Sequence, residues 1–299
     1  MTDRAAAAGE VAGGTDNPWL GRRVLAFAHQ GGAREAPSST IFALARAAAV
    51  GADALELDVH RSADDHLVVC HDATVDRTTD GTGRIADLTL EQLQALDNAH
   101  WWRPGEVVDH EADPADRPLR GRAPQERSLG IATLAEVLAA FPAVLLNLDI
   151  KQTAPDVVPY EAQLAEELVA AGRLDDVIVA SFSDASLDAF KAQGTGIGTS
   201  CGPRDVLALA QALAAGEPIP EQVRTHVAIQ VPPRFAGADV VTAAAVHAAH
   251  DAGIAVHVWT IDDEVEMRRL IELGVDGVMS DRPSVLVSVL DDLGARWRG

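Results

Sequence analysis

Two acidic residues alternate along one short apolar segment, and their types and spacing suit the binding of a divalent cation. In ALELDVHR, Glu56 and Asp58 flank Leu57. Side chains alternate between the two faces of a strand, so both carboxylates project from one face and the apolar residues from the other. Neighbouring like charges need a compensating cation, and a hard divalent ion with oxygen ligands supplies it. Solvated or arginine-paired acids are the plainer alternative, but acids within an apolar strand favour a site.

A second segment, VLLNLDIK, repeats this pattern and adds a positive charge. Asn147, Asp149 and Lys151 share one face of the expected strand. Polar residues near the carboxyl ends of parallel barrel strands face the side where catalytic residues collect. We therefore expect Asp149 to complete the metal site and Lys151 to hold a phosphate oxygen as a point charge. A salt bridge between the two is the ordinary alternative.

Two histidines close apolar segments, His29 at the end of VLAFAH and His71 at the end of LVVCH. Histidine titrates near neutral pH, so a pair of imidazoles can divide the roles of proton acceptor and donor in one reaction. A single histidine at a strand end is more often structural. Two of them converging with three acids and a lysine favour a catalytic site.

The elements that must position these residues alternate between short strands and amphipathic helices, which is typical of a parallel α/β sheet. Capping-box spacings begin two of the helices, at Thr89 with Gln92 and at Thr133 with Glu136. The expected strands are Val24–Ala28, Ala54–Val59, Leu67–His71, Val144–Ile150, Val177–Ser181, Gly196–Ser200, Val227–Val231, Ala255–Thr260 and Gly277–Ser280. This is one strand more than a TIM (β/α)8 barrel needs.

We assign the surplus strand to a β-hairpin arm beside the barrel, because the chain between Ala54 and His71 is too short for a parallel crossover. With Asp64 and Asp65 as its turn, the hairpin places Asp58 opposite His71. Residues 1–20 are expected to form a disordered tail, and residues 21–299 a single domain. An aperiodic insertion at about 98–129 contains Trp101 and Trp102, and is either a functional excursion or a solvated loop.

Composition narrows the function classes. The 299 residues carry a formal net charge of −21, which disfavours nucleic acid and anionic membrane surfaces as partners. Two cysteines, Cys70 and Cys201, suit a reducing compartment. No secretory signal and no membrane span are recognised, so we expect a cytoplasmic enzyme acting on a small molecule. The oligomeric state stays open.

The sequence resembles the glycerophosphodiester phosphodiesterase family along most of its length. The similar motifs run in family order from residue 24 to about residue 285: AHQGG, APSSTIFALARAAAVGADALELDVHRSADDHLVVCHDATVDRTT, NLDIK, Ser181–Phe182, VHVWTIDD and GVDGVMSDRP. The resemblance implies a TIM barrel, a metal held by Glu56, Asp58 and Asp149, and catalysis by His29 and His71. It further implies hydrolysis of glycerophosphodiesters to glycerol 3-phosphate and an alcohol, through a cyclic phosphate intermediate. Calcium or magnesium is the expected ion, with manganese as a third candidate.

The sequence departs from this family at three positions. Gln30 stands where the family has a phosphate-binding arginine, and Arg34 is a candidate substitute. Ser38 stands where the family has an acid, and Asp149 replaces a glutamate, which shortens that ligand by one methylene.

Substrate binding is assigned to Lys151, Gln30, Arg34 and Trp259, although a buried core tryptophan is the competing interpretation of Trp259. Two other functions stay open. One is a phosphodiesterase resembling lysophospholipase D or sphingomyelinase D, with the two adjacent tryptophans of the insertion at the mouth of the barrel. The other is a barrel that binds a phosphodiester without cleaving it.

Overall fold

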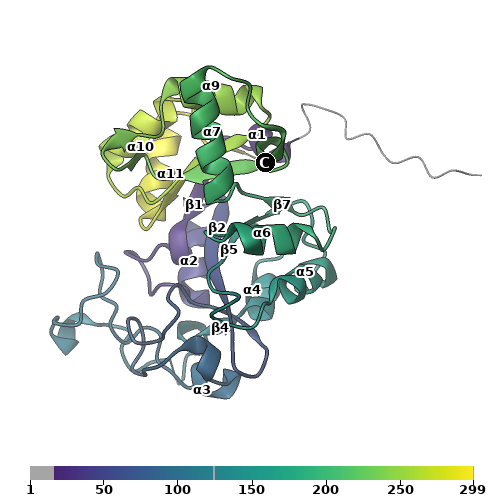
Figure 1. Ribbon diagram of the computed structural model, residues 1–299. Helices are drawn as coiled ribbons and strands as arrows, with labels where there is room; N and C mark the ends of the chain where they lie inside the picture. The colour runs from purple at the N-terminus through teal and green to yellow at the C-terminus, as the bar shows by residue number, and fades with distance from the viewer. Residues whose placement is uncertain (1–16, 124, 299) are drawn as a thin grey trace, which may run out of the picture.

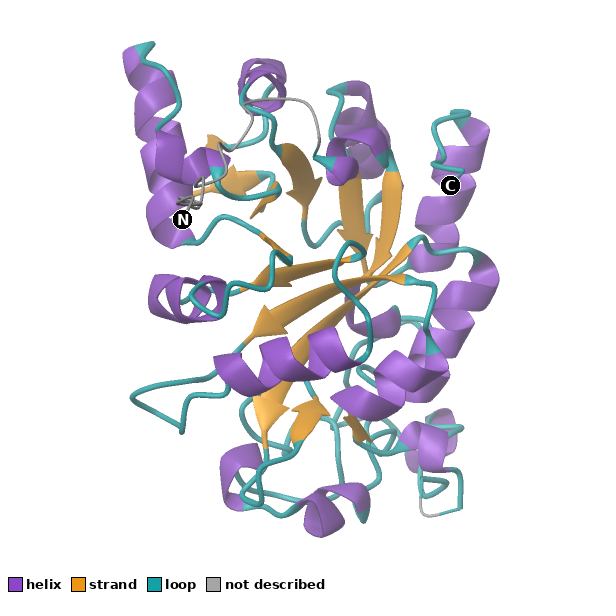
Figure 2. Ribbon diagram, turned by 90° about the vertical axis from the view of Figure 1, so that its right-hand side faces the viewer, coloured by secondary structure: helices purple, strands orange, loops and turns teal. Residues whose placement is uncertain are grey.

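Eight parallel strands follow one another around a barrel in the computed structural model, which describes residues 17–123 and 125–298 (Figures 1 and 2). Each strand pairs with the next along the chain, and β12 returns to β1. Ser200 and Ala228 form the parallel bridge that joins β7 to β8 and completes the ring. The barrel strands are β1 (Leu25–Ala28), β2 (Ala54–Arg61), β5 (Leu145–Ile150), β6 (Val177–Ala180), β7 (Gly198–Thr199), β8 (Ala228–Val231), β11 (Ala255–Val258) and β12 (Gly277–Ser280).

A helix follows each barrel strand before the next begins, and these helices surround the strands (Figure 2). They are α2 (Ile41–Val50), α4 (Leu134–Ala140), α5 (Glu161–Ala170), α6 (Asp184–Lys191), α7 (Pro203–Ala215), α9 (Ala243–Asp251), α10 (Glu264–Glu272) and α11 (Pro283–Asp292). The capping boxes predicted at Thr89 and Thr133 both form, at the starts of α3 (Leu90–Gln94) and α4. The predicted TIM barrel is confirmed.

Apolar side chains fill the barrel and its outer layer. Phe27, Ala54, Leu145 and Met279 belong to a cluster on the inside, and larger clusters lie between strands and helices. Burial of this apolar surface is the main stabilising contribution to the fold.

The tail prediction needs correction at its end. Residues 1–16 lie outside the described residues. Residues 17–20 are part of the fold, since α1 (Pro18–Gly21) buries Trp19 in the interior cluster. The side chain of Asn17 donates to the carbonyl oxygens of Val227 and Gly253.

The predicted hairpin arm is also present. β3 (Leu67–Val69) pairs antiparallel with the extended end of β2, and β4 (Ala132–Thr133) pairs with β3. The predicted register is wrong by one residue. The loop has three residues, with Asp65 in the left-handed region (φ 69°), so Asp58 lies opposite Cys70 rather than His71.

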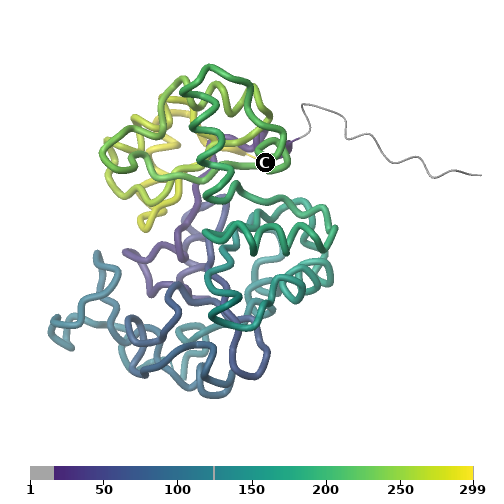
Figure 3. The backbone as a smooth tube through the Cα atoms, in the orientation of Figure 1, coloured from purple at the N-terminus to yellow at the C-terminus, as the bar shows by residue number. Residues whose placement is uncertain are grey.

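The long segment between β3 and β4 leaves the barrel and packs beside its mouth, as the blue and teal part of the trace shows (Figure 3). It contains the 3-10 helices η2 (Ile85–Asp87), η3 (Pro114–Asp116) and η4 (Arg127–Leu129), together with α3. Trp102 is buried, and its indole N–H donates to the carbonyl oxygen of Ala33. The predicted insertion is therefore packed on the barrel, and Trp102 is not a surface anchor.

Several short elements, α1 and β4 among them, had no counterpart in the sequence prediction. β9 (Arg234–Phe235) and β10 (Ala238–Asp239) form an exposed hairpin after β8, and α8 (Glu221–Arg224) precedes β8. Among the described residues, no helix combines the length and apolar character that crossing a bilayer requires.

Candidate active site

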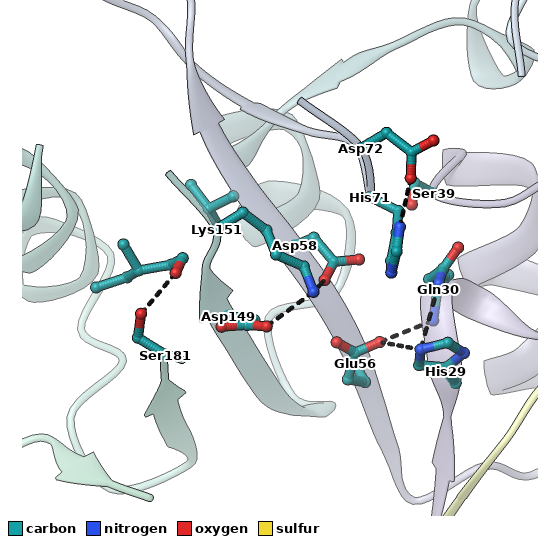
Figure 4. A network of polar contacts seen from close by, with 12 residues as sticks. His29, Gln30, Ser39, Glu56, Asp58, His71, Asp72, Asp149, Lys151 and Ser181 are labelled. Atoms are coloured by element: carbon teal, nitrogen blue, oxygen red, sulfur yellow. Dashed lines mark hydrogen bonds and ion pairs between the residues drawn. The ribbon is translucent and has the colours of Figure 1, made fainter. Parts of the chain in front are cut away.

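The predicted acids meet where strands β2 and β5 run side by side (Figure 4). Parallel pairing places the Cα of Asp58 opposite that of Asp149, and Glu56 opposite Asn147. All three carboxylates are buried, with exposed fractions of 5% for Glu56, 0% for Asp58 and 6% for Asp149. Strand register therefore gathers three buried acids at the carboxyl-terminal mouth of the barrel, as the sequence pattern predicted.

Lys151 lies between two of these acids. Its Nζ is 2.9 Å from Asp58 Oδ1 and 2.9 Å from Asp149 Oδ2. Within the described chain, Asp58 Oδ2 and Asp149 Oδ1 are buried and accept no hydrogen bond. Burial raises the pKa of Asp58 to about 7, with a further contribution from Glu56, while Lys151 opposes the rise. Burial also raises the pKa of Glu56 and Asp149. The pocket thus lacks enough positive charge for three ionised carboxylates.

His29 follows β1 and is held by an acid that the sequence prediction did not include. Its Nδ1 is 2.7 Å from Asp281 Oδ1, directly after β12, and its Nε2 is 3.9 Å from Glu56 Oε2. An ionised carboxylate only accepts hydrogen bonds, so Nδ1 carries the proton in this contact. Burial lowers the pKa of His29, but Glu56 and Asp281 outweigh it and raise the value to about 9. The SDRP segment contributes to the family resemblance, but a carboxylate after a strand gives no signal of its own in the sequence.

His71 lies on the arm and has a separate carboxylate partner. Its Nδ1 is 2.6 Å from Oδ1 of Asp72, which also pairs with Arg77. Nε2 of the buried His60 is 3.3 Å from the carbonyl oxygen of His71, and burial lowers the pKa of His60 to about 4, which keeps it neutral. The His29 and His71 rings lie 6.2 Å apart at 76°. Each imidazole is therefore oriented by its own acid, and the two rings lie close together.

Gln30 and Ser38, two departures from the family pattern, are in direct contact. The Ser38 hydroxyl donates to Gln30 Oε1 at 2.5 Å, and Gln30 Nε2 is 3.2 Å from His29 Nε2. The backbone N–H of Gln30 donates to Glu56 Oε2 at 3.0 Å. Gln30 adopts φ 52°, which positions both groups toward the site. Gln30 thus contacts His29 through its side-chain amide and Glu56 through its backbone N–H, and Ser38 holds the amide.

Two other predicted substrate-binding residues lie differently. Arg34 pairs with Asp262 at 3.0 Å and donates to the carbonyl oxygen of Gly105, so it does not replace the missing arginine. Gly31 and Gly32, both with positive φ, form the turn that leads to it. Trp259 follows β11 and makes an edge contact with the exposed Phe182, at 5.8 Å between ring centroids. Lys151 Nζ lies 5.7 Å from the Phe182 ring, so Phe182 adjoins the lysine of the site and Trp259 contacts Phe182.

The donor chemistry of the acids fits a hard divalent ion, because two buried carboxylate oxygens are unpartnered within the described chain. The side chains are not preassembled around one position. In residues 17–123 and 125–298, no three His, Cys, Asp or Glu side chains lie close enough to hold an ion together. Lys151 draws Asp58 and Asp149 toward itself, whereas Gln30 and His29 hold Glu56.

Known proteins resemble this chain in both sequence and fold. Residues 29–285 match the model of the glycerophosphoryl diester phosphodiesterase family. A glycerophosphodiester phosphodiesterase of Caldanaerobacter subterraneus is 31% identical over 278 residues, covering 90% of this chain and 98% of the relative. One from Bacillus subtilis is 28% identical over 277 residues, covering 89% of this chain and 86% of the relative.

Solved structures agree on the fold. A glycerophosphodiester phosphodiesterase from Agrobacterium tumefaciens superposes with a TM-score of 0.66 at 23% identity, over 89% of this chain and 99% of that one. A phosphodiesterase of Oleispira antarctica in complex with the product sn-glycerol-3-phosphate gives 0.67 at 23%, over 91% and 99%. The match of the family model to most of the chain, together with the relative at 31% identity, shows that this protein belongs to the glycerophosphoryl diester phosphodiesterase family.

Proposed function

We propose that this protein hydrolyses glycerophosphodiesters to glycerol 3-phosphate and an alcohol, with a divalent metal ion and the histidines His29 and His71. One observation carries the proposal: two imidazoles, each oriented by its own carboxylate, lie 6.2 Å apart beside three buried acids and a lysine. The names of the relatives and the product bound in the Oleispira antarctica structure support the substrate class.

Glu56, Asp58 and Asp149 would hold the ion, since they come from adjacent strands and lack sufficient countercharge. Bound there, a divalent ion would polarise a phosphoryl oxygen and stabilise the charge that develops on it. Calcium and magnesium are the favoured ions, with manganese as the third candidate, because all three accept carboxylate oxygens.

The chain's own residues supply the proton transfers. With Nδ1 of each histidine directed to Asp281 or Asp72, Nε2 is the nitrogen left for transfer, and at His29 it lies 3.2 Å from the Gln30 amide nitrogen. One imidazole would deprotonate the attacking hydroxyl and the other would protonate the leaving alcohol. Attack by water would give glycerol 3-phosphate directly, whereas attack by the glycerol 2-hydroxyl would give a cyclic phosphate that water then opens. Lys151 would share the phosphate charge, and Gln30 would donate a neutral hydrogen bond from its amide.

The packing of the insertion favours a small substrate over a lipid. Trp102 is buried, and Trp101 is partly covered by His110 and Arg117. These tryptophans therefore do not form the exposed aromatic loop that a lipid-active enzyme would present. The formal net charge of −21 further disfavours anionic membrane surfaces and nucleic acid, and a cytoplasmic location remains part of this proposal.

A substrate panel tests the proposal. Chelator-treated protein is supplied with calcium, magnesium or manganese and assayed on glycerophosphocholine, glycerophosphoethanolamine and lysophosphatidylcholine. We expect metal-dependent release of glycerol 3-phosphate from the first two, with kcat/KM at least roughly 10-fold higher than on the lysolipid. Preference for the lysolipid would favour the lysophospholipase D alternative. Binding without turnover under any ion would favour the non-catalytic barrel.

A further inference from the structure

Arg77 lies in the turn that follows His71 and binds the carboxylate of Asp72, the residue next to that histidine. Arg77 Nε donates to Asp72 Oδ2 at 2.6 Å, and Arg77 Nη2 donates to Asp72 Oδ1 at 3.1 Å. This two-point contact restricts both the position and the rotation of the carboxylate, which a single ammonium charge would not do. Burial raises the pKa of Asp72, but His71 and Arg77 outweigh it and hold the pKa well below its usual range. Asp72 therefore stays ionised at any working pH.

His71 depends on the rotation of that carboxylate. The same oxygen, Asp72 Oδ1, accepts from Arg77 Nη2 and from His71 Nδ1, the latter at 2.6 Å. Freed from Arg77, the carboxylate could turn away, and the imidazole would then lose the contact that selects its tautomer. Unlike the acids on β2 and β5, His71 follows the end of β3 and has no strand pairing of its own.

The insertion supports the same turn from outside. His110 Nε2 is 3.0 Å from the carbonyl oxygen of Arg77, and the indole N–H of Trp101 donates to the carbonyl oxygen of Thr79 at 2.7 Å. The His110 and Trp101 rings stack at 4.6 Å with an 8° angle. Arg117 covers Trp101, 4.5 Å from the ring centroid. These contacts tie the insertion to the turn of His71.

We propose that Arg77 is a positioning residue that orients His71 through Asp72, and that the insertion's Trp101–His110 stack braces this arrangement. The insertion then serves as a fixed support for one catalytic side chain, His71. The inference rests on the proposed catalytic role of His71, and its test includes a measurement that does not depend on turnover.

The test compares Arg77→Ala and Arg77→Lys with the matched control Arg84→Ala. Arg84 lies in the same segment, is exposed, and donates only to the carbonyl oxygen of Asp156 within the described chain. Histidine ring signals of ¹⁵N-labelled protein report the tautomer, with the His71 signal assigned by its loss in His71→Gln. We expect wild type and Arg84→Ala to show His71 protonated at Nδ1. Both Arg77 variants should show mixed or exchange-broadened tautomers.

Kinetics supply the second readout. Arg77→Ala should lower kcat at least roughly 10-fold, with KM changed less than about 3-fold. The loss is a part of the rate acceleration of about 10²–10⁴ that a positioned acid or base contributes. Millimolar guanidinium should restore part of this rate to Arg77→Ala and none to His71→Gln. Should Arg77→Ala fail to fold, the spectrum of Arg77→Lys decides. An unchanged His71 tautomer in the folded Arg77 variants would overturn the proposal, even if the protein hydrolyses no phosphodiester.

Discussion

The two halves of the candidate site are built in different ways. Glu56, Asp58 and Asp149 belong to barrel strands, so the hydrogen-bond ladder between β2 and β5 fixes their positions. His71 lies on the arm, where side-chain contacts with Asp72 and the carbonyl contact of His60 hold it. A barrel supplies rigid positions wherever a strand ends, whereas a residue outside it needs dedicated supports.

His29 lies between these extremes. It directly follows β1, and its partner Asp281 directly follows β12, the strand paired with β1. Its orientation therefore depends on a side-chain contact between two strand ends, together with the Gln30 amide and Glu56 beside its other ring nitrogen. The comparison predicts that changes in the strand-borne half affect metal binding, and that changes in the arm affect the proton transfers.

Removing either imidazole should give the largest effect and tests whether the two halves share one reaction. His29→Ala and His71→Ala are each expected to lower kcat by about 10²–10⁴, because each loses a positioned acid or base. KM should change far less. Steady-state kinetics with saturating metal measure this, with the exposed His247→Ala as the control. Full activity in His71→Ala would show that the arm takes no part in the reaction.

A smaller loss is expected when the partner of His29 is changed. Asp281→Asn preserves shape but removes the charge that orients Nδ1 and stabilises the imidazolium, so kcat should fall roughly 10–100-fold. Metal affinity, measured separately by calorimetry, should stay within about 2-fold of wild type. Loss of metal binding in this variant would show that the His29 half is not separable from the strand-borne acids.

The pH dependence of stability sharpens the same comparison. Folding raises the pKa of His29 from 6.5 to about 9. Its contribution to the free energy of unfolding is therefore fully present below pH 6.5 and is lost as pH rises through 9. With chelator present, the free energy of unfolding in urea should fall by about 1–3 kcal/mol between pH 7 and pH 9. His29→Gln should remove most of this slope. An equal slope in that variant would assign it to other groups.

The aromatic rim should give the smallest effect. Phe182→Ala and Trp259→Ala remove contact surface beside the acid cluster without touching the histidines or acids that perform chemistry. We expect KM to rise about 2–5-fold and kcat to stay within about 2-fold, the pattern of lost substrate binding. Measuring kcat and KM separately on glycerophosphocholine checks this. A large fall in kcat would show that these residues contribute to the proton transfers themselves.

The strand-borne half could be predicted from sequence because alternation along a strand is a local pattern. Glu56 and Asp58 share a face by that rule alone, and register with VLLNLDIK then placed Asp149 beside them. All nine predicted strands appear, with ends that differ by at most two residues. Contacts set by loops were harder to predict. The hairpin register was off by one because the loop holds three residues, Ala63, Asp64 and Asp65, instead of the two expected.

Residues that act through contacts between distant segments carry no such local signal. Asp281 lies 252 residues from His29 along the chain. Arg77 lies only five residues from Asp72, but a side-chain pair within an irregular turn has no periodicity that would reveal it in the sequence. Arg34 was a plausible phosphate ligand because of its charge and its position close to Gln30, but the loop after His29 turns it toward Asp262. The adjacent pair His71–Asp72 was visible in the sequence, although its meaning required the geometry of the arm.

Calorimetric titration of manganese into chelator-treated protein tests the division between the two halves most directly. We expect Asp58→Asn and Asp149→Asn to lose more than about 10-fold in affinity. His71→Gln and Arg77→Ala should bind within about 2-fold of wild type while losing turnover. Wild-type affinity in both aspartate variants, or loss of metal binding in His71→Gln, would contradict the account.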